Sequence, residues 1–113
     1  RMMNEKLNEV GGFAYSPEEQ AFAEKIYATL MSPSVPLDSH AVVQAFDFER
    51  PGLGSTDVGD VSWTVPTVGL RTATWVPGTS AHSWQATAAG GMGIGFKGMN
   101  VASQTLALAG KEL

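Results

Sequence analysis

The sequence contains no cysteine and few charged residues. Without cysteine, the chain has neither a disulfide framework nor a thiolate metal site. Only 16% of the residues are charged, and 11 acidic against 7 basic residues give a net charge of −4, so no basic surface is expected for nucleic acid. No apolar run approaches the roughly 18 residues of a membrane span, and the first residues lack the apolar stretch of a signal peptide. We therefore expect a cytoplasmic protein that binds neither nucleic acid nor membrane.

The length allows one small domain with one modest core, because the chain has 113 residues, of which 43% are hydrophobic. The chain starts at Arg1 within a stretch that has the pattern of a helix, so we expect a fragment or a processed piece of a longer protein. Glycine is abundant, with 13 residues, most of them at 52–59 and 90–98. Glycine-rich backbone is typical of places where a chain segment or a ligand approaches closely, which directs attention to the second half.

Two helices are predicted in the first third of the chain. Apolar residues spaced by three and four predict a helix over residues 2–10, which Gly11 ends in the manner of a left-handed cap. Ser16 and Glu19 have the spacing of a capping box, so a second helix of about four turns is expected to follow Ser16. The proline-containing run 32–36 ends that helix.

The middle of the chain is less clearly patterned. Residues 41–48 fit a short strand or one helical turn. Ser55 or Thr56 is suited to cap a helix, although a strand over 61–65 is the alternative. Residues 68–75 alternate in polarity and contain two threonines, so they predict a strand.

One long helix is predicted from about residue 86 to the end of the chain. Gly91 and Gly95 would give it a flat face that a neighbouring element can approach, at a cost of roughly 0.8–1 kcal/mol per glycine relative to alanine. Helix, strand and helix in this order predict an α/β fold. The apolar stripe expected to face the core consists of Met92, Phe96, Met99, Ala102 or Ser103, Leu106 and Ala109.

His82 is the first candidate for chemistry, since it follows a loop at the end of the predicted strand, where α/β proteins place functional groups. A histidine there can be a metal ligand or a general base, and the alternative is a surface or helix-capping histidine. His40, in a loop with no sequence partner, is interpreted as structural. One histidine cannot make a metal site, because catalytic zinc needs about three protein ligands.

The loop Gly54-Ser55-Thr56-Asp57 precedes a predicted helix, so its backbone N–H groups could hold a carboxylate, although an ordinary capped loop fits as well. A Ser-His-Asp triad can be assembled from Ser55 or Ser62 with His82 and Asp57 or Asp60, but it lacks the G-x-S-x-G turn. Residues 93–98 match G-x-G-x-x-G without the strand before it or the acidic residue after it that a dinucleotide site needs. We interpret these glycines as packing positions.

Two motifs together resemble a known family. Residues 54–63 read G-S-T-D-V-G-D-V-S-W and residues 82–85 read H-S-W-Q. This pair resembles the C-terminal part of amidohydrolases of the p-aminobenzoyl-glutamate hydrolase type, a branch of the metallopeptidase family that includes carboxypeptidase G and the aminoacylases. The stretch before residue 37 is also similar, so the resemblance extends over nearly all 113 residues and is weakest at 37–50.

The resemblance implies that residues 1–113 are the C-terminal segment of a catalytic α/β domain. The first catalytic segment and a lid and dimerisation domain would be absent from this chain. It implies two divalent metal ions, zinc or manganese, in the intact enzyme, with His82 as the ligand that this segment supplies. It also places Gly54, Ser55, Thr56 and Asp57 beside the substrate carboxylate. The implied reaction is hydrolysis of an aryl-acyl amino acid amide such as p-aminobenzoyl-glutamate.

In this family the remaining metal ligands and the general-base glutamate belong to the first catalytic segment. With one ligand, the 113 residues alone are expected to be inactive and need hold no metal. They are expected to expose the face that the missing segment covers, and therefore to form a homo-oligomer. The rival interpretation is a small self-associating α/β interaction module without catalysis, in which the histidine loop and the glycine loop are only structural.

Overall fold

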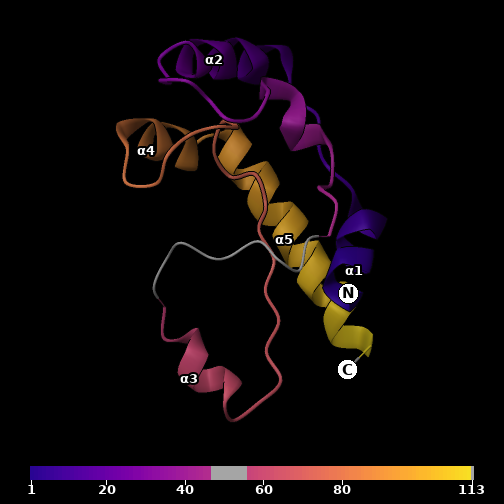
Figure 1. Ribbon diagram of the computed structural model, residues 1–113. Coiled ribbons are helices and arrows are strands. Elements are labelled where there is room, and N and C mark those ends of the chain that lie inside the picture. Colours follow the sequence, from indigo (N-terminus) through magenta and orange to yellow (C-terminus); the bar gives the residue numbers. More distant parts are fainter. Residues whose placement is uncertain (47–55, 113) are drawn as a thin grey trace.

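The computed structural model describes residues 1–46 and 56–112, and these residues contain helices and no strand (Figure 1). The predicted α/β class and the helix-strand-helix order are therefore wrong. None of the described helices combines the length and the apolar character that crossing a membrane requires. The elements are α1 (Met2–Val10), α2 (Pro17–Tyr27), the 3-10 helix η1 (Leu37–Ala41), α3 (Val58–Ser62), α4 (Trp84–Gly90) and α5 (Gly93–Glu112).

The predicted strand over residues 68–75 is an extended segment without a pairing partner among the described residues. Its alternating pattern suits a strand, but a strand also needs the backbone groups of a neighbour. Thr74 N instead donates to Thr72 O at 3.0 Å, a bond within the segment itself. The alternative strand over 61–65 is wrong as well, because α3 and a following turn occupy these positions.

The end of α1 and the start of α2 lie where the sequence predicts them, although Gly11, with a ψ of −178°, is not in the left-handed helical conformation that was expected. Ser16 Oγ accepts from Glu19 N at 3.2 Å, and the Glu19 carboxylate accepts from Ser16 N at 2.7 Å, which completes the capping box. Helix α2 ends at Tyr27 after 11 residues, about three turns and not the expected four. Gly11 ends α1 with a φ of +82°, a region that glycine enters without strain, and its N–H donates to Leu7 O.

The predicted C-terminal helix is divided into α4 and α5 at Gly91 and Met92. Met92 N donates to Ala89 O at 3.1 Å, three residues back, so the α-helical ladder is interrupted at this point. Glycine is the weakest helix former apart from proline, and the junction is rich in it. The chain turns here and brings Gly95 so close to the Gly90 carbonyl that a Cβ at Gly95 would overlap it.

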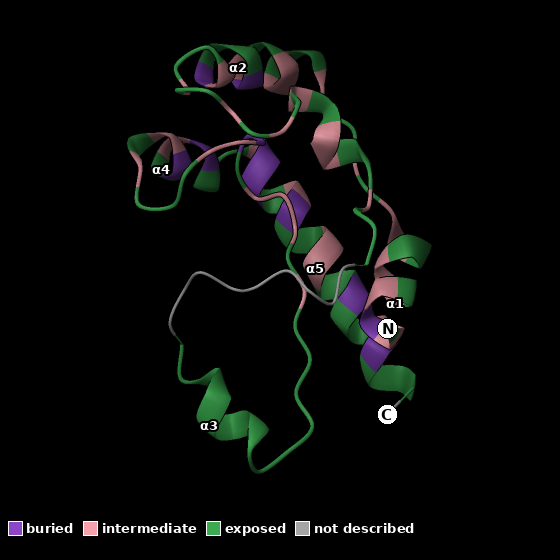
Figure 2. Cartoon of the chain, viewed as in Figure 1, coloured by how far each residue is buried: buried purple, intermediate pink, exposed green. Residues whose placement is uncertain are grey.

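Helix α5 faces the opposite way from the prediction (Figure 2). The expected core residues Met92, Phe96, Met99 and Leu106 are 47–57% exposed. Small residues turn inward instead because they allow the backbone of a neighbour to approach: a Cβ at Gly98 would overlap the Ala73 carbonyl. The flat glycine face predicted at Gly91 and Gly95 is thus formed by Gly95 and Gly98, whereas Gly91 is exposed. The buried residues of α5 are Ile94, Gly95, Gly98, Thr105 and Ala109, of which only Ala109 belonged to the predicted stripe.

A small core joins α2, α4 and the start of α5. Ion pairs reinforce the helix packing: Lys97 Nζ lies 2.5 Å from Glu19 Oε2 and also donates to Ala14 O, and Lys6 of α1 pairs with Glu112 at the end of α5. Helices α1 and α5 pack side by side, with both termini at one end of the molecule (Figure 1). The core residues are Ala23, Ile26, Val76, Ala89 and Ile94.

The segment around α3, residues 56–69, is exposed throughout. Trp63 is 90% exposed, and four valines of this segment are about half exposed. The radius of gyration is 15.1 Å, against about 13 Å for a compact chain of this length. The accessible surface is 8075 Å², against roughly 6,000 Å² for a compact monomer of this mass. The chain therefore leaves much more surface unburied than a domain of its size normally does.

Candidate functional site

His82 lies between the loop that follows Val76 and the start of α4. Val76 is 1% exposed and fixes the beginning of this loop in the core. Ser83 then caps α4, since its Oγ accepts from Ala86 N at 3.2 Å and donates to Ser80 O at 2.7 Å. His82 itself has a φ of +58°, a left-handed conformation that few non-glycine residues adopt and that is often found at functional positions.

The His82 side chain is exposed at the edge of a hollow of about 440 Å³. The indoles of Trp75 and Trp84 line the same hollow and are 37% and 60% exposed. In the part of the chain that the structure describes, no group forms a hydrogen bond or an ion pair with the imidazole. A ring nitrogen of His82 is thus available to an outside ligand, whereas Ser83 is used as a helix cap.

The described residues do not complete a metal centre around His82. No group of three His, Cys, Asp or Glu side chains lies within reach of a common ion in residues 1–46 and 56–112. Because a catalytic zinc ion takes about three protein ligands, the described part of the chain does not fit a metal site by itself. His82 can contribute one donor to a site whose other donors come from elsewhere.

The predicted substrate loop is not joined to His82. Gly54 and Ser55 lie outside the described residues. Thr56 and Asp57 are exposed, and Thr56 Oγ1 accepts from Val58 N at 3.4 Å. The N-cap of α3 is Asp57, without a side-chain capping bond, so the predicted cap at Thr56 is wrong, and Ser55 lies outside the described residues. Neither residue lines the hollow beside His82, and Figure 1 shows α3 far from α4. Within residues 1–46 and 56–112, the structure therefore does not bring residues 56–63 of the first motif beside residues 82–85 of the second.

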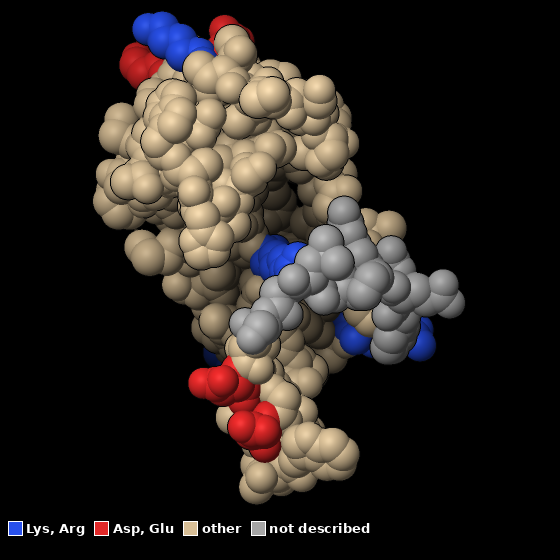
Figure 3. Space-filling model, turned by 60° about the vertical axis from the view of Figure 1, so that its left-hand side comes forward, with Lys and Arg blue, Asp and Glu red and all other residues tan. Residues whose placement is uncertain are grey.

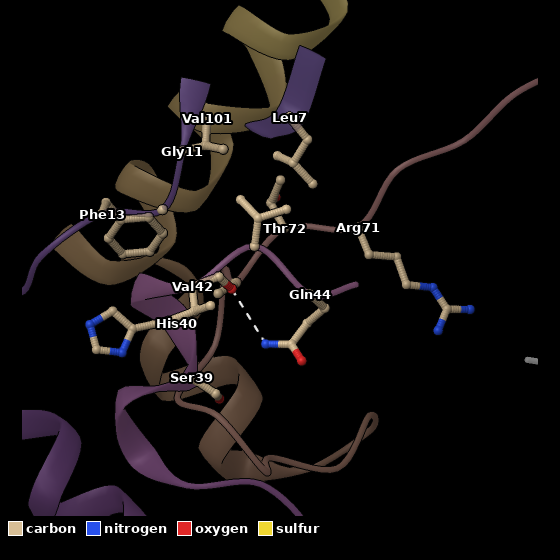
Figure 4. Close-up of a pocket in the computed structure, with 13 residues that line it drawn as sticks. Leu7, Gly11, Phe13, Ser39, His40, Val42, Gln44, Arg71, Thr72 and Val101 are labelled. Carbon is tan, nitrogen blue, oxygen red and sulfur yellow. Dashed lines mark hydrogen bonds between the residues drawn. The ribbon is translucent and has the colours of Figure 1, made fainter. Parts of the chain in front are cut away.

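A second hollow, which the sequence did not predict, lies between the segment after η1 and the extended segment 70–73 (Figure 4). It has a volume of about 160 Å³ and apolar walls that include Leu7, Phe13 and Val101. Gln44 and Arg71 extend to the side opposite Phe13, and the Arg71 guanidinium has no ion-pair partner among the described residues. The sequence offered only one signal for Arg71, as a lone cation within a stretch of small and apolar residues.

His40 lies in a cluster of rings, in agreement with the structural role expected for it. Its ring is stacked on Tyr15 at a centroid distance of 3.6 Å and an angle of 4°, with Phe13 beside both. His40 Nδ1 lies 2.9 Å from Leu37 O, so this nitrogen must carry the hydrogen, because a carbonyl only accepts. Burial raises the pKa of Tyr15 to about 12, and the Glu19 carboxylate adds to the effect. Both rings are therefore held as packing elements.

The match with a known protein covers about half of the chain. Over 53 residues, 47% of this chain, the sequence is 43% identical to the B subunit of p-aminobenzoyl-glutamate hydrolase from Escherichia coli (strain K12). The matched stretch spans 11% of the length of that protein. No family model and no solved structure matches the chain. The resemblance inferred from the two motifs is thus confirmed for a limited part of a much longer relative.

Proposed function

We propose that the chain is the C-terminal catalytic segment of a metal-dependent amidohydrolase. The observation that carries the proposal is the 43% identity over 53 residues to a protein named as a subunit of p-aminobenzoyl-glutamate hydrolase. The proposed reaction is hydrolysis of the amide bond between an aryl-acyl group and an amino acid. Two divalent ions, zinc or manganese, would supply the activated water of this reaction when bound.

In this proposal His82 is the one metal ligand that the chain provides. Its imidazole is exposed, has no partner within the described residues and projects from a loop that the buried Val76 anchors. Since the described residues lack the remaining ligands, another segment of the enzyme supplies them. The chain without that segment is expected to be inactive.

The loop 54–57 is proposed to hold the substrate carboxylate in the assembled enzyme. Thr56 and Asp57 sit on the exposed segment 56–69, which has many unburied apolar side chains and no extensive packing on the other helices. Contact with the missing segment would bury these side chains and position the loop near His82. The large accessible surface of 8075 Å² is consistent with such a partner.

The test is hydrolysis of p-aminobenzoyl-glutamate by the protein isolated from its source with every segment and chain that accompanies it. Activity should disappear with a chelator and return with zinc or manganese. His82→Ala should lower both metal content and kcat/KM, the latter by at least about 100-fold. His40→Asn, which removes the other histidine, should leave the metal content unchanged. Full activity of His82→Ala, or no hydrolysis with either metal, would contradict the proposal.

A second candidate function is a self-associating interaction module without catalysis. The half-exposed Phe96, Met99 and Leu106 on α5, together with Met92 just before it, favour this candidate, because monomeric proteins rarely leave such a row of large apolar side chains in water. Metal content separates the two candidates. The hydrolase should bind metal in a manner that depends on His82, whereas an interaction module should bind none.

A further inference from the structure

The exposed side of α5 carries a regular apolar seam. From Met92 onward, the outward residues follow one another at intervals of four, three, four, three and four positions. This alternation is the a/d repeat with which two helices pack side by side. The seam consists of Met92, which directly precedes α5, and Phe96, Met99, Ser103, Leu106 and Gly110 on α5, all of which are exposed.

The seam is separate from the packing that holds α5 in its own chain. The inward side of the helix is formed by residues such as Ile94 and Thr105, which are fully buried. Of the charged residues on α5, Lys97 and Glu112 are engaged in ion pairs within the chain, and none lies on the seam. Figure 3 shows that a large part of the molecular surface is uncharged. No charge on the seam would therefore oppose close approach of a second helix.

We infer that two copies of this chain associate through antiparallel packing of their α5 helices along this seam. An antiparallel pair centred near Val101 places Met99 against Ser103 and Met92 against Gly110 of the other copy, so that large side chains face small ones. Phe96 then faces Leu106. A parallel pair would place Phe96 against itself and Ser103 against itself, which leaves large residues crowded and small ones unfilled.

The area of the unburied surface fits a second copy. The accessible surface of 8075 Å² exceeds the expectation for a compact monomer by roughly 2,000 Å². Specific protein–protein interfaces bury about 1,200–2,000 Å² in total, which is about 600–1,000 Å² from each copy. A second copy on α5 therefore accounts for up to about half of the surplus and leaves the segment 56–69 available for another contact. Helix α5 has 20 residues and is about 30 Å long, so it offers several turns to such an interface. The inference holds whether or not the chain is part of a hydrolase.

The first test is sedimentation equilibrium of the 113-residue chain in the micromolar range. We expect a dimer, and Met99→Glu should raise its dissociation constant at least about 100-fold, because each dimer would bury two unpaired carboxylates. Gln104→Glu adds the same charge to α5 away from the seam and should leave the dimer intact. Circular dichroism establishes that both variants fold. A monomeric wild type, or a dimer unchanged by Met99→Glu, would overturn the inference.

The second test determines whether the two α5 helices are antiparallel or parallel, by disulfide cross-linking. Because the chain has no native cysteine, only introduced cysteines can form the disulfide. Met99→Cys and Ser103→Cys variants are oxidised separately and as a mixture. Antiparallel packing predicts a disulfide-linked dimer in the mixture and little in either variant alone. Efficient cross-linking of Met99→Cys to itself would establish parallel packing and overturn the proposed arrangement.

Discussion

The helical body and the segment around α3 differ in how much of their structure the chain itself provides. In the body, residues from distant parts of the same chain pack or pair with one another: Ile94 lies in the core, Gly98 packs against Ala73, and Lys6 pairs with Glu112. In the segment 56–69, side chains as large as that of Trp63 have almost no packing. The two regions are similar in apolar content but not in burial.

Because of this difference, the residues that stabilise the chain and the residues that carry the family motif around α3 lie in different regions. Burial of apolar surface is the main stabilising term in folding, so the free energy of the chain resides in the helical body. Thr56 and Asp57, the described residues of the Gly-Ser-Thr-Asp motif, belong to the segment 56–69, which is exposed throughout. Changes in the body should therefore unfold the protein, while changes around α3 should leave it folded.

The largest expected effect is that of Ile94→Ala. Ile94 is 0% exposed in the centre of the core, and removing a buried isoleucine side chain costs about 2–5 kcal/mol of unfolding free energy. Urea unfolding followed by circular dichroism measures this loss. Met99→Ala, on the exposed side of the same helix, should cost much less under conditions in which the chain is monomeric. An equal loss of unfolding free energy in both variants would contradict the structure, in which Ile94 is buried and Met99 is exposed.

The next largest effect is the difference in stability between two Gly→Ala variants of α5. A Cβ at Gly98 would overlap the Ala73 backbone, whereas a Cβ at Gly110 meets nothing within 4 Å. Both Gly→Ala changes gain up to about 1 kcal/mol from helix propensity. Gly98→Ala also overpacks a contact between backbones, so under conditions in which the chain is monomeric it should be less stable than Gly110→Ala by about 1–3 kcal/mol. A thermal unfolding midpoint that rises equally in both variants would contradict the close approach at Gly98.

A smaller effect depends on pH. Hydrogen bonding from the Lys97 ammonium, and from Ser16 N–H, holds the pKa of Glu19 below its ordinary value of 4.5. As the pH falls, Glu19 is therefore protonated in the unfolded chain before it is protonated in the folded chain. Its contribution to the unfolding free energy is complete above the ordinary pKa of the carboxyl group and disappears as the pH falls through the lowered pKa of the folded state. Glu19→Gln should reduce the unfolding free energy at neutral pH by at most about 1 kcal/mol, because water screens the half-exposed pair. The difference between wild type and variant should disappear in acid, and a constant difference would indicate lost packing instead.

The parts of the fold that could be predicted correctly depend on residues that are close together in the sequence. The capping box at Ser16 and Glu19 and the end of α1 at Gly11 involve contacts over a few positions, and the spacing of residue types specifies them. The strand over 68–75 was wrong because pairing depends on a neighbour that no local pattern specifies. The facing of α5 was wrong because large apolar residues were assumed to be buried, while close backbone contact at Gly98 gave the inward side to small ones.

The candidate site could be predicted only in part for a similar reason. The loop before a helix that was predicted for His82 was confirmed, since the loop and the cap at Ser83 are local features, but the strand expected to precede this loop was wrong. Its role as a metal ligand stays a prediction. The distance between His82 and the loop 54–57 depends on how distant segments pack, and no periodicity contains that information. The hollow beside Arg71 was missed because segments far apart in sequence form its walls.

The smallest expected effect is at Trp63, and it tests the comparison most directly. Trp63 is 90% exposed, so Trp63→Ser should change the unfolding free energy by no more than about 0.5 kcal/mol, the usual range for surface positions. A loss above about 1 kcal/mol in urea unfolding would show that the chain itself buries this indole. In the proposed hydrolase the same variant should reduce the activity of the assembled protein, because the segment 56–69 is where another segment would make contact. A variant that is neutral in the chain and impaired in the enzyme would show that the apolar residues around α3 serve assembly and not the folding of this chain.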